Sequence, residues 1–217
     1  EPEAITMTKV LLAAAIMAIG AATAGFRLPF LLAVAGLLTI NGGWDNLKKS
    51  TDGSRMRSYF GTYTVTDDGN SRWLMHGTTM HGMQLRNEPT RPISYYPVTS
   101  GVGIALANAP RLYGANASIG VVGLGTGTLA CYQRPGQYWQ FFEIDRLVVE
   151  IARERKIFSF LERCAPDAEI TLGDARLTLA QVPQGKFDIL ALDAFSSDSI
   201  PLHLLTKEAF ATYRRAL

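Results

Sequence analysis

The sequence predicts an α/β fold in which a parallel sheet occupies the C-terminal half of the chain. Strand-like and helix-like segments alternate over residues 113–217. A glycine-rich turn follows the first of these strands, and acidic residues follow the next three. Because the carboxyl ends of parallel strands meet at the same edge of a sheet, we expect the turn and the acids to lie together.

The composition is that of a folded protein with few clues to its partners. The chain has 217 residues, of which 47% are hydrophobic, and a formal net charge of +2. This composition excludes general disorder, and no run of lysines and arginines indicates a nucleic-acid partner. Cys131 and Cys164 lack the spacing of metal ligands, so we expect reduced core thiols and no metal site. The helical pattern over 207–217 has no stop signal, which predicts a C-terminally incomplete sheet.

Residues 1–42 are strongly apolar and are predicted to form a transmembrane helical hairpin. Arg27 is the only charged residue between positions 10 and 40, and it separates the apolar segments 4–24 and 28–40. The first segment is about long enough to cross a bilayer, whereas the second needs its flanks to do so. A buried helical pair in a soluble core and a cleaved signal peptide are the alternatives.

A basic linker, residues 43–56, comes after the apolar segments. The basic residues in and just after it are Lys48, Lys49, Arg55 and Arg57. Basic residues next to a membrane segment are typical of its cytoplasmic side. The sequence therefore predicts a protein of the cell inner membrane whose larger, C-terminal part faces the cytoplasm.

Residues 57–112 are predicted to form a small β-hairpin unit and a substrate-side segment. The runs 59–65 and 72–76 alternate apolar and polar residues and flank Asp67-Asp-Gly-Asn70, a strong hairpin signal. A helical pattern is present at 101–109.

Residues 113–217 are predicted to form a nucleotide-binding, Rossmann-like domain. Four strands alternate with helical segments, and this succession predicts that the strands are parallel. The expected strands are 119–122, 139–144, 169–172 and 187–192, and the expected helices begin at 128 and cover 147–161.

The glycine-rich turn predicts a nucleotide ligand. Gly123, Gly125 and Gly127 stand between a strand and a helical pattern, where glycines allow a sharp turn and a close approach to a ligand. Glu143, at the end of the next strand, is placed to bind a ribose diol. Asp145 is expected to cap the following helix.

Two classes of nucleotide are compatible with this turn. The glycine spacing also fits a dinucleotide fingerprint, so an NAD enzyme stays open on that evidence. The third strand is followed by Asp174 and Ala175. In S-adenosylmethionine-type sites, an aspartate typically accepts a hydrogen bond from the adenine amine, and the next residue donates its backbone N–H to the ring. Asp174 and Ala175 therefore favour S-adenosylmethionine over NAD.

Four motifs together resemble the spermidine synthase (aminopropyltransferase) family, and specifically its membrane-fused bacterial branch. They are Gly123-Leu-Gly-Thr-Gly127, Phe142-Glu-Ile-Asp145, Gly173-Asp-Ala175 and Leu192-Asp-Ala-Phe-Ser-Ser-Asp-Ser-Ile-Pro201. The resemblance covers about 57–217. It implies an S-adenosylmethionine-methyltransferase-type sheet, with the catalytic part cytoplasmic, that transfers an aminopropyl group from decarboxylated S-adenosylmethionine to a polyamine acceptor. A homodimer is also expected.

The resemblance also implies roles for individual residues. Asp193 matches the catalytic base, and Asp198 matches an amine-binding carboxylate within a stretched motif. Tyr96 and Gln84 are expected to be walls of the substrate pocket. Thr126 stands where synthases usually carry a loop aspartate that grips the aminopropyl amine, so intact S-adenosylmethionine stays open as the donor.

Three further interpretations stay open. His76 and His81 form a repeated His-Gly pattern that could line the amine site, but hydrogen-bonded structural histidines are favoured over metal ligands. The missing loop aspartate favours an S-adenosylmethionine-dependent methyltransferase as the second function. A non-catalytic polyamine- or nucleoside-sensing domain is the third.

Overall fold

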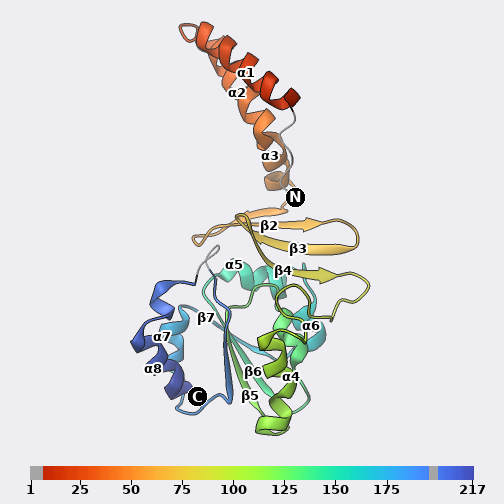
Figure 1. Ribbon diagram of the computed structural model, residues 1–217, viewed down its shortest axis with the longest axis vertical. Coiled ribbons are helices and arrows are strands. Elements are labelled where there is room, and N and C mark those ends of the chain that lie inside the picture. The colour runs from red at the N-terminus through yellow and green to blue at the C-terminus, as the bar shows by residue number, and fades with distance from the viewer. Residues whose placement is uncertain (1–6, 196–199) are drawn as a thin grey trace. The chain divides into compact units, whose positions relative to one another are not determined.

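The computed structural model describes residues 7–195 and 200–217, and the chain divides into two compact units (Figure 1). The first unit is Glu1–Arg55 and the second is Met56–Leu217. The second unit contains the predicted nucleotide-binding residues.

The first unit consists of helices. α1 (Met7–Ala22) and α2 (Arg27–Leu38) coincide with the two apolar segments of the sequence and pack against each other. A π-helix at Thr39–Gly43 leads into α3 (Trp44–Thr51). Within the described part of the chain, none of the helices has both the length and the apolar character needed to span a membrane.

An antiparallel sheet forms the N-terminal part of the second unit. The predicted hairpin is confirmed, with Tyr63 opposite His76 in the register. Its turn is closed by Asp68, whose carboxylate accepts hydrogen bonds from the backbone N–H groups of Asn70 and Ser71. A further strand pairs with the second arm of the hairpin. In spatial order the strands are β1 (Arg55–Arg57), β2 (Thr62–Asp67), β3 (Ser71–His76) and β4 (Thr79–Leu85).

The predicted parallel sheet is also confirmed. Its order is β7-β6-β5-β8, and every neighbouring pair is parallel. The two central strands, β5 and β6, are almost entirely buried, as is typical of parallel strands covered on both faces. The strands are β5 (Ser118–Val122), β6 (Tyr138–Glu143), β7 (Glu169–Leu172) and β8 (Ile189–Leu192).

The helical connections differ from the predicted ones in two places. A 3-10 helix, Thr128–Tyr132, follows the glycine-rich turn, because Pro135 and Gly136 come too soon for an α-helix to continue. The predicted helix 147–161 is broken into shorter pieces around Lys156, which has a φ of +52°. The helical elements of this unit are α4 (Gly101–Tyr113), α5 (Arg146–Val149), a π-helix (Glu150–Glu154), α6 (Phe160–Cys164), α7 (Ala175–Leu179), a 3-10 helix (Leu202–Leu204) and α8 (Lys207–Ala216).

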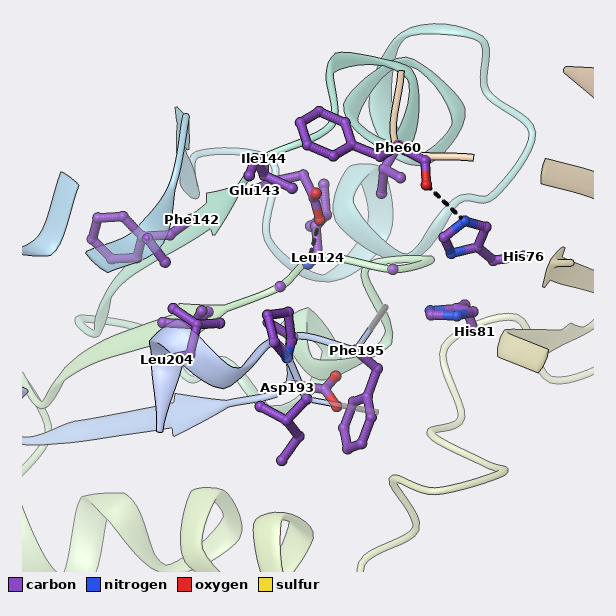
Figure 2. A pocket seen from close by; sticks show the side chains of 18 of the residues that line it. Phe60, His76, His81, Leu124, Phe142, Glu143, Ile144, Asp193, Phe195 and Leu204 are labelled. Atoms are coloured by element: carbon purple, nitrogen blue, oxygen red, sulfur yellow. Dashed lines mark hydrogen bonds between the residues drawn. The ribbon is translucent and has the colours of Figure 1, made fainter. Parts of the chain in front are cut away.

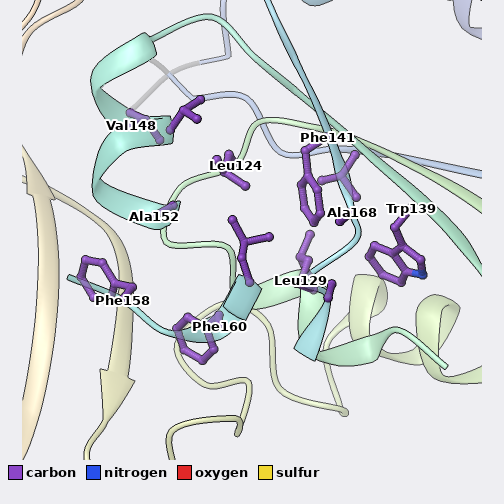
Figure 3. Packing of buried hydrophobic residues seen from close by; sticks show 14 of the residues in the cluster. Leu124, Leu129, Trp139, Phe141, Val148, Ala152, Phe158, Phe160 and Ala168 are labelled. Carbon is purple, nitrogen blue, oxygen red and sulfur yellow. The ribbon is translucent and has the colours of Figure 1, made fainter. Parts of the chain in front are cut away.

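Apolar clusters form the core on both faces of the parallel sheet. Side chains along β6 alternate between the faces. Trp139 and Phe141 are buried in one cluster with Phe160 (Figure 3). Phe142 lies in the other cluster and makes an edge-to-face contact with Phe187, with ring centroids 5.9 Å apart. β6 is therefore packed on both faces, and it positions Glu143 at the carboxyl edge of the sheet.

The expectation of reduced cysteines is wrong. Cys131 and Cys164 form a disulfide that joins the 3-10 helix behind the glycine-rich turn to the end of α6. The two cysteines are 33 residues apart in the sequence. Such a separation gives no local signal of pairing, and the expected cytoplasmic location argued against it.

Replacing both cysteines with serine should lower the free energy of unfolding by about 3 kcal/mol, because the bridge closes a 33-residue loop in the unfolded chain. Urea denaturation followed by tryptophan fluorescence measures the change. The wild-type protein in dithiothreitol is the matched control and should unfold at the same urea concentration as the double variant. Equal stability of the variant and the oxidised wild type would show that the disulfide does not constrain the fold.

Candidate active site

A cavity of about 760 Å³ opens at the carboxyl edge of the parallel sheet (Figure 2). Residues that come after each of the four parallel strands line it, together with side chains of the antiparallel sheet. The glycine-rich turn and the three acidic positions thus meet at one place. The residues at the strand ends or just after them are Gly123–Gly125, Glu143 and Ile144, Gly173–Ala175, and Asp193–Phe195.

Two of the three glycines shape the cavity by allowing close backbone contacts. Gly123 has a φ of +95°, and a Cβ there would collide with the carbonyl oxygen of Asp193. Gly125 has a φ of +53°, and its Cβ would lie 2.9 Å from the carbonyl oxygen of His81. These glycines bring the end of β8 and strand β4 against the turn, which a side chain at either position would prevent.

The third glycine has a different role from the predicted one. Gly127 does not line the cavity, and a Cβ there would lie 3.0 Å from Leu161 Cγ of α6. Its φ of +84° ends the turn. Gly127 therefore serves the packing of the turn on α6 rather than contact with a ligand.

Glu143 is buried at the floor of the cavity and is held by the backbone. Its Oε2 accepts from the Leu124 N–H at 2.9 Å, and its Oε1 accepts from the Asp145 N–H at 2.9 Å. Burial raises the pKa of Glu143, and the two N–H donors oppose that rise. A carboxylate has about four lone-pair positions, so Glu143 retains acceptor capacity for a ligand in the cavity.

Asp145 caps α5, as predicted, by accepting from the Leu147 N–H at 2.9 Å. Ser58, which precedes β2, donates its hydroxyl to the other oxygen of the same carboxylate. This hydrogen bond joins the segment before β2 to the turn that follows Glu143.

Asp174 and Ala175 lie together at the cavity end of α7. Asp174 Oδ1 accepts from the Arg176 N–H at 2.8 Å and caps the helix. Asp174 Oδ2 lies 3.3 Å from Nε2 of His203, a cavity residue that no sequence pattern singled out. The buried Ala175 begins the helix, where a backbone N–H has no intrahelical acceptor.

Asp193 and Tyr96 form a hydrogen-bonded pair in the cavity wall. The Tyr96 hydroxyl donates to Asp193 Oδ2 at 2.7 Å, across 97 residues of sequence. Burial raises the pKa of Asp193 to about 6, and the bond from Tyr96 opposes the rise. The Tyr132 hydroxyl donates to the Tyr96 carbonyl oxygen at 2.6 Å and fixes that segment. Asp193 is thus a half-buried carboxylate whose pKa is raised to about 6.

Three other residues singled out in the sequence have different outcomes. Thr126 is buried beneath Gly82 and lies 2.8 Å from the Thr128 hydroxyl, so it does not reach the cavity. The assignment of Gln84 to the pocket wall is corrected, because its side chain donates to the Pro89 carbonyl oxygen at 2.7 Å, outside the cavity. Asp198 lies outside the described residues.

His76 and His81 both line the cavity. His76 is buried, stacks on Tyr63 with ring centroids 4.5 Å apart, and has its Nε2 3.2 Å from the Phe60 carbonyl oxygen. The hydrogen bond expected of a structural histidine is thus present at His76. Across residues 7–195 and 200–217, no cluster of three histidine, cysteine or acidic side chains is arranged to hold a metal ion.

The chain is similar to solved structures only at the level of fold. No known family model matches it, and no curated protein matches it in sequence. A probable spermidine synthase from Corynebacterium glutamicum has a TM-score of 0.63 at 17% identity, covering 75% of this chain and 59% of that one. The spermidine synthase of Thermotoga maritima has a TM-score of 0.54 at 18% identity, covering 75% and 52%.

A spermidine synthase in complex with the transition-state analogue AdoDATO has a TM-score of 0.56 at 19% identity, covering 75% of this chain and 53% of that one. This chain thus spans between 52% and 59% of the length of the three structures. In its fold, the chain is similar to the spermidine synthases.

Proposed function

We propose that the chain is a spermidine-synthase-like transferase that moves an aminopropyl group from decarboxylated S-adenosylmethionine to an amine. The observation that carries the proposal is that Glu143 and Asp193 face one cavity from two parallel strands in different environments. Glu143 receives two backbone N–H groups, as suits a carboxylate that binds and orients. Asp193 has a pKa raised to about 6, as suits a base.

The cavity residues fit an adenosyl group. Glu143 has acceptor capacity for a ribose diol. Asp174 Oδ2 and the Ala175 N–H stand next to each other, as an acceptor and a donor for the edge of an adenine ring. The apolar side chains of Val122 and Leu204 also line the cavity and supply surface for the ring to pack on.

Positioning and one proton transfer account for the chemistry. A sulfonium makes the neighbouring CH₂ electrophilic, so the protein has to orient an unprotonated amine towards it. The amine nitrogen forms the new C–N bond, the C–S bond breaks with its electron pair passing to sulfur, and Asp193 accepts the proton that the nitrogen loses. Tyr96 holds the carboxylate in place through its 2.7 Å hydrogen bond.

One observation favours a second function, methyl transfer from intact S-adenosylmethionine. The position where the resemblance leads us to expect a loop aspartate is Thr126, which is buried and turned towards Thr128. It therefore supplies no charge for the amino group of an aminopropyl chain. Turnover with labelled donors separates the two reactions, since only aminopropyl transfer requires the decarboxylated form.

Replacing Glu143 with alanine should weaken binding of 5′-methylthioadenosine by roughly 10- to 150-fold, since hydrogen bonds to a buried carboxylate contribute about 1.5–3 kcal/mol. Calorimetry measures the affinity, and a thermal melt checks that the turn at Leu124 is intact. Glu169→Gln, at the amino end of β7, is the matched control and should bind like the wild type. If NADH binds and adenosyl compounds do not, the proposed ligand class is wrong.

Asp193→Asn should leave adenosyl binding nearly unchanged and lower kcat by roughly 10²–10⁴, the range typical of the loss of a general base. The amide keeps the size of the side chain but cannot accept the proton. In the wild type, kcat should fall as the pH drops below about 6, because the Asp193 pKa is raised to about 6 and the base becomes protonated. The variant should lack this acidic limb.

The control for this variant is Asp188→Asn, at the opposite end of β8, which should retain turnover. Asp188 accepts from the Ser118 N–H at 2.8 Å and does not line the cavity. An Asp193→Asn enzyme with unchanged turnover would remove Asp193 from the mechanism.

We also propose that α1 and α2 lie in a lipid bilayer and that the catalytic unit faces the cytoplasm. The large apolar side chains of both helices are exposed in the structure, which favours an apolar environment around them. Lys48 and Lys49 on α3 favour a cytoplasmic location for the unit that begins at Met56. The exposed side chains of the two helices include Leu11, Leu12, Leu28, Leu31, Leu32 and Leu38.

A cysteine introduced at Ser50 should resist a membrane-impermeant maleimide in intact cells and react after the cells are permeabilised. Ser50 is exposed on α3, and replacing Cys131 and Cys164 with serine leaves the introduced cysteine as the only thiol of the 217-residue chain. Ready labelling of intact cells would place the catalytic unit outside, where a disulfide is typical.

A further inference from the structure

We propose that Asp145 is a positioning residue for nucleotide binding. Its backbone N–H holds the Glu143 carboxylate, and its own carboxylate is held by the hydroxyl groups of Ser58 and Tyr63. The inference rests on the proposed function, in which Glu143 binds the ribose diol. It goes further, because it makes the affinity for the nucleotide depend on side chains at the start of the second unit.

Two backbone N–H groups orient Glu143. Leu124, in the glycine-rich turn, donates to Glu143 Oε2 at 2.9 Å (Figure 2). Asp145 donates to Glu143 Oε1 at 2.9 Å. The Glu143 side chain is buried, so these two donors set the direction in which its remaining lone pairs face a ligand. A shift of either donor would turn the carboxylate that is proposed to bind the ribose.

The cap of α5 does not require a carboxylate at position 145. Capping uses one oxygen, Oδ1, which accepts from the Leu147 N–H at 2.9 Å. A serine at an N-cap position stabilises a helix about as well as an aspartate does. Asp145 is only 2% exposed, and burying a carboxylate is unfavourable unless its oxygens are hydrogen-bonded. Its second oxygen therefore indicates a role beyond the helix cap.

Two hydroxyl groups bind the Asp145 carboxylate from the start of the second unit. Ser58 donates its hydroxyl to Oδ2, and the Ser58 oxygen accepts from the Phe60 N–H at 3.0 Å. The Tyr63 hydroxyl also donates to the carboxylate, and burial together with this bond raises the pKa of Tyr63. The buried Tyr63 ring stacks on His76, with ring centroids 4.5 Å apart. Both hydroxyls are thus themselves fixed.

The side chain and the N–H of Asp145 act together because they belong to one residue. Asp145 has an extended backbone, with φ −99° and ψ 112°, between β6 and α5. The hydroxyls that fix its carboxylate therefore also fix the N–H that Glu143 accepts. Without them the residue can shift, and a ligand would have to order Glu143 at the cost of affinity.

The test measures the binding of 5′-methylthioadenosine to the full chain by calorimetry. Asp145→Ser keeps an oxygen for the helix cap but takes the carboxylate away from Ser58 and Tyr63, so it should weaken binding at least about tenfold. Ser58→Ala removes one of the two hydroxyls at a position that does not line the cavity. It should weaken binding by about two- to tenfold, the range of a single hydrogen bond.

Repeating both substitutions in the Glu143→Ala protein separates positioning from a merely structural role. That protein has no carboxylate at position 143 to orient, so neither Asp145→Ser nor Ser58→Ala should weaken binding further. Ligand-observed NMR measures the low affinities of these double variants.

The matched control is Asp68→Ser. The Asp68 carboxylate also accepts from two backbone N–H groups, but it does so in the turn of the β-hairpin and does not line the cavity. This variant should melt at a lower temperature than the wild type and bind 5′-methylthioadenosine with unchanged affinity. A general loss of stability is thereby distinguished from a loss of positioning.

The failure of this inference differs from the failure of the proposed function. If the wild type binds 5′-methylthioadenosine and neither Asp145→Ser nor Ser58→Ala weakens binding, Asp145 is only a helix cap. If both weaken binding by the same factor with and without the Glu143 carboxylate, their effect does not act through Glu143, and the inference is also wrong. The transferase function stands in both cases. If 5′-methylthioadenosine does not bind the wild type, the proposed function fails.

Discussion

The close contact between the glycine-rich turn and the two strand ends beside it is the constraint on which the site depends. Gly123 lies against the backbone of Asp193, where a Cβ would collide. The next residue, Leu124, donates its N–H to Glu143 at 2.9 Å. Because β5 pairs with both β6 and β8, this short turn sets the separation between the carboxylates of Glu143 and Asp193.

Residues far from the parallel strands in sequence complete the site. Their hydrogen bonds hold the acidic residues at the ends of those strands. Tyr96 reaches Asp193 from the segment before α4, and Tyr132 holds the Tyr96 backbone from behind the turn. Ser58 binds Asp145, which anchors the antiparallel unit over the cavity. The result is one cavity lined by the carboxyl ends of the parallel strands and by side chains of the antiparallel sheet.

Most of the framework could be predicted from local patterns, and the long-range contacts could not. Apolar runs and turn residues located the four parallel strands and the β-hairpin, and Asp145 was recognised as a helix cap. The disulfide between Cys131 and Cys164, the contact of His203 with Asp174 and the removal of Gln84 from the pocket depend on which loops meet in three dimensions. Local sequence patterns do not carry that information.

The central claim is that an adenosyl nucleotide binds in the same cavity that Asp193 lines. A crystal structure of the full chain with 5′-methylthioadenosine tests this claim most directly. We expect the ribose hydroxyls on Glu143, the adenine ring beside Asp174 and the thioether sulfur facing Asp193. Electron density for the ligand outside this cavity, or with its sulfur directed away from Asp193, would contradict the proposed arrangement.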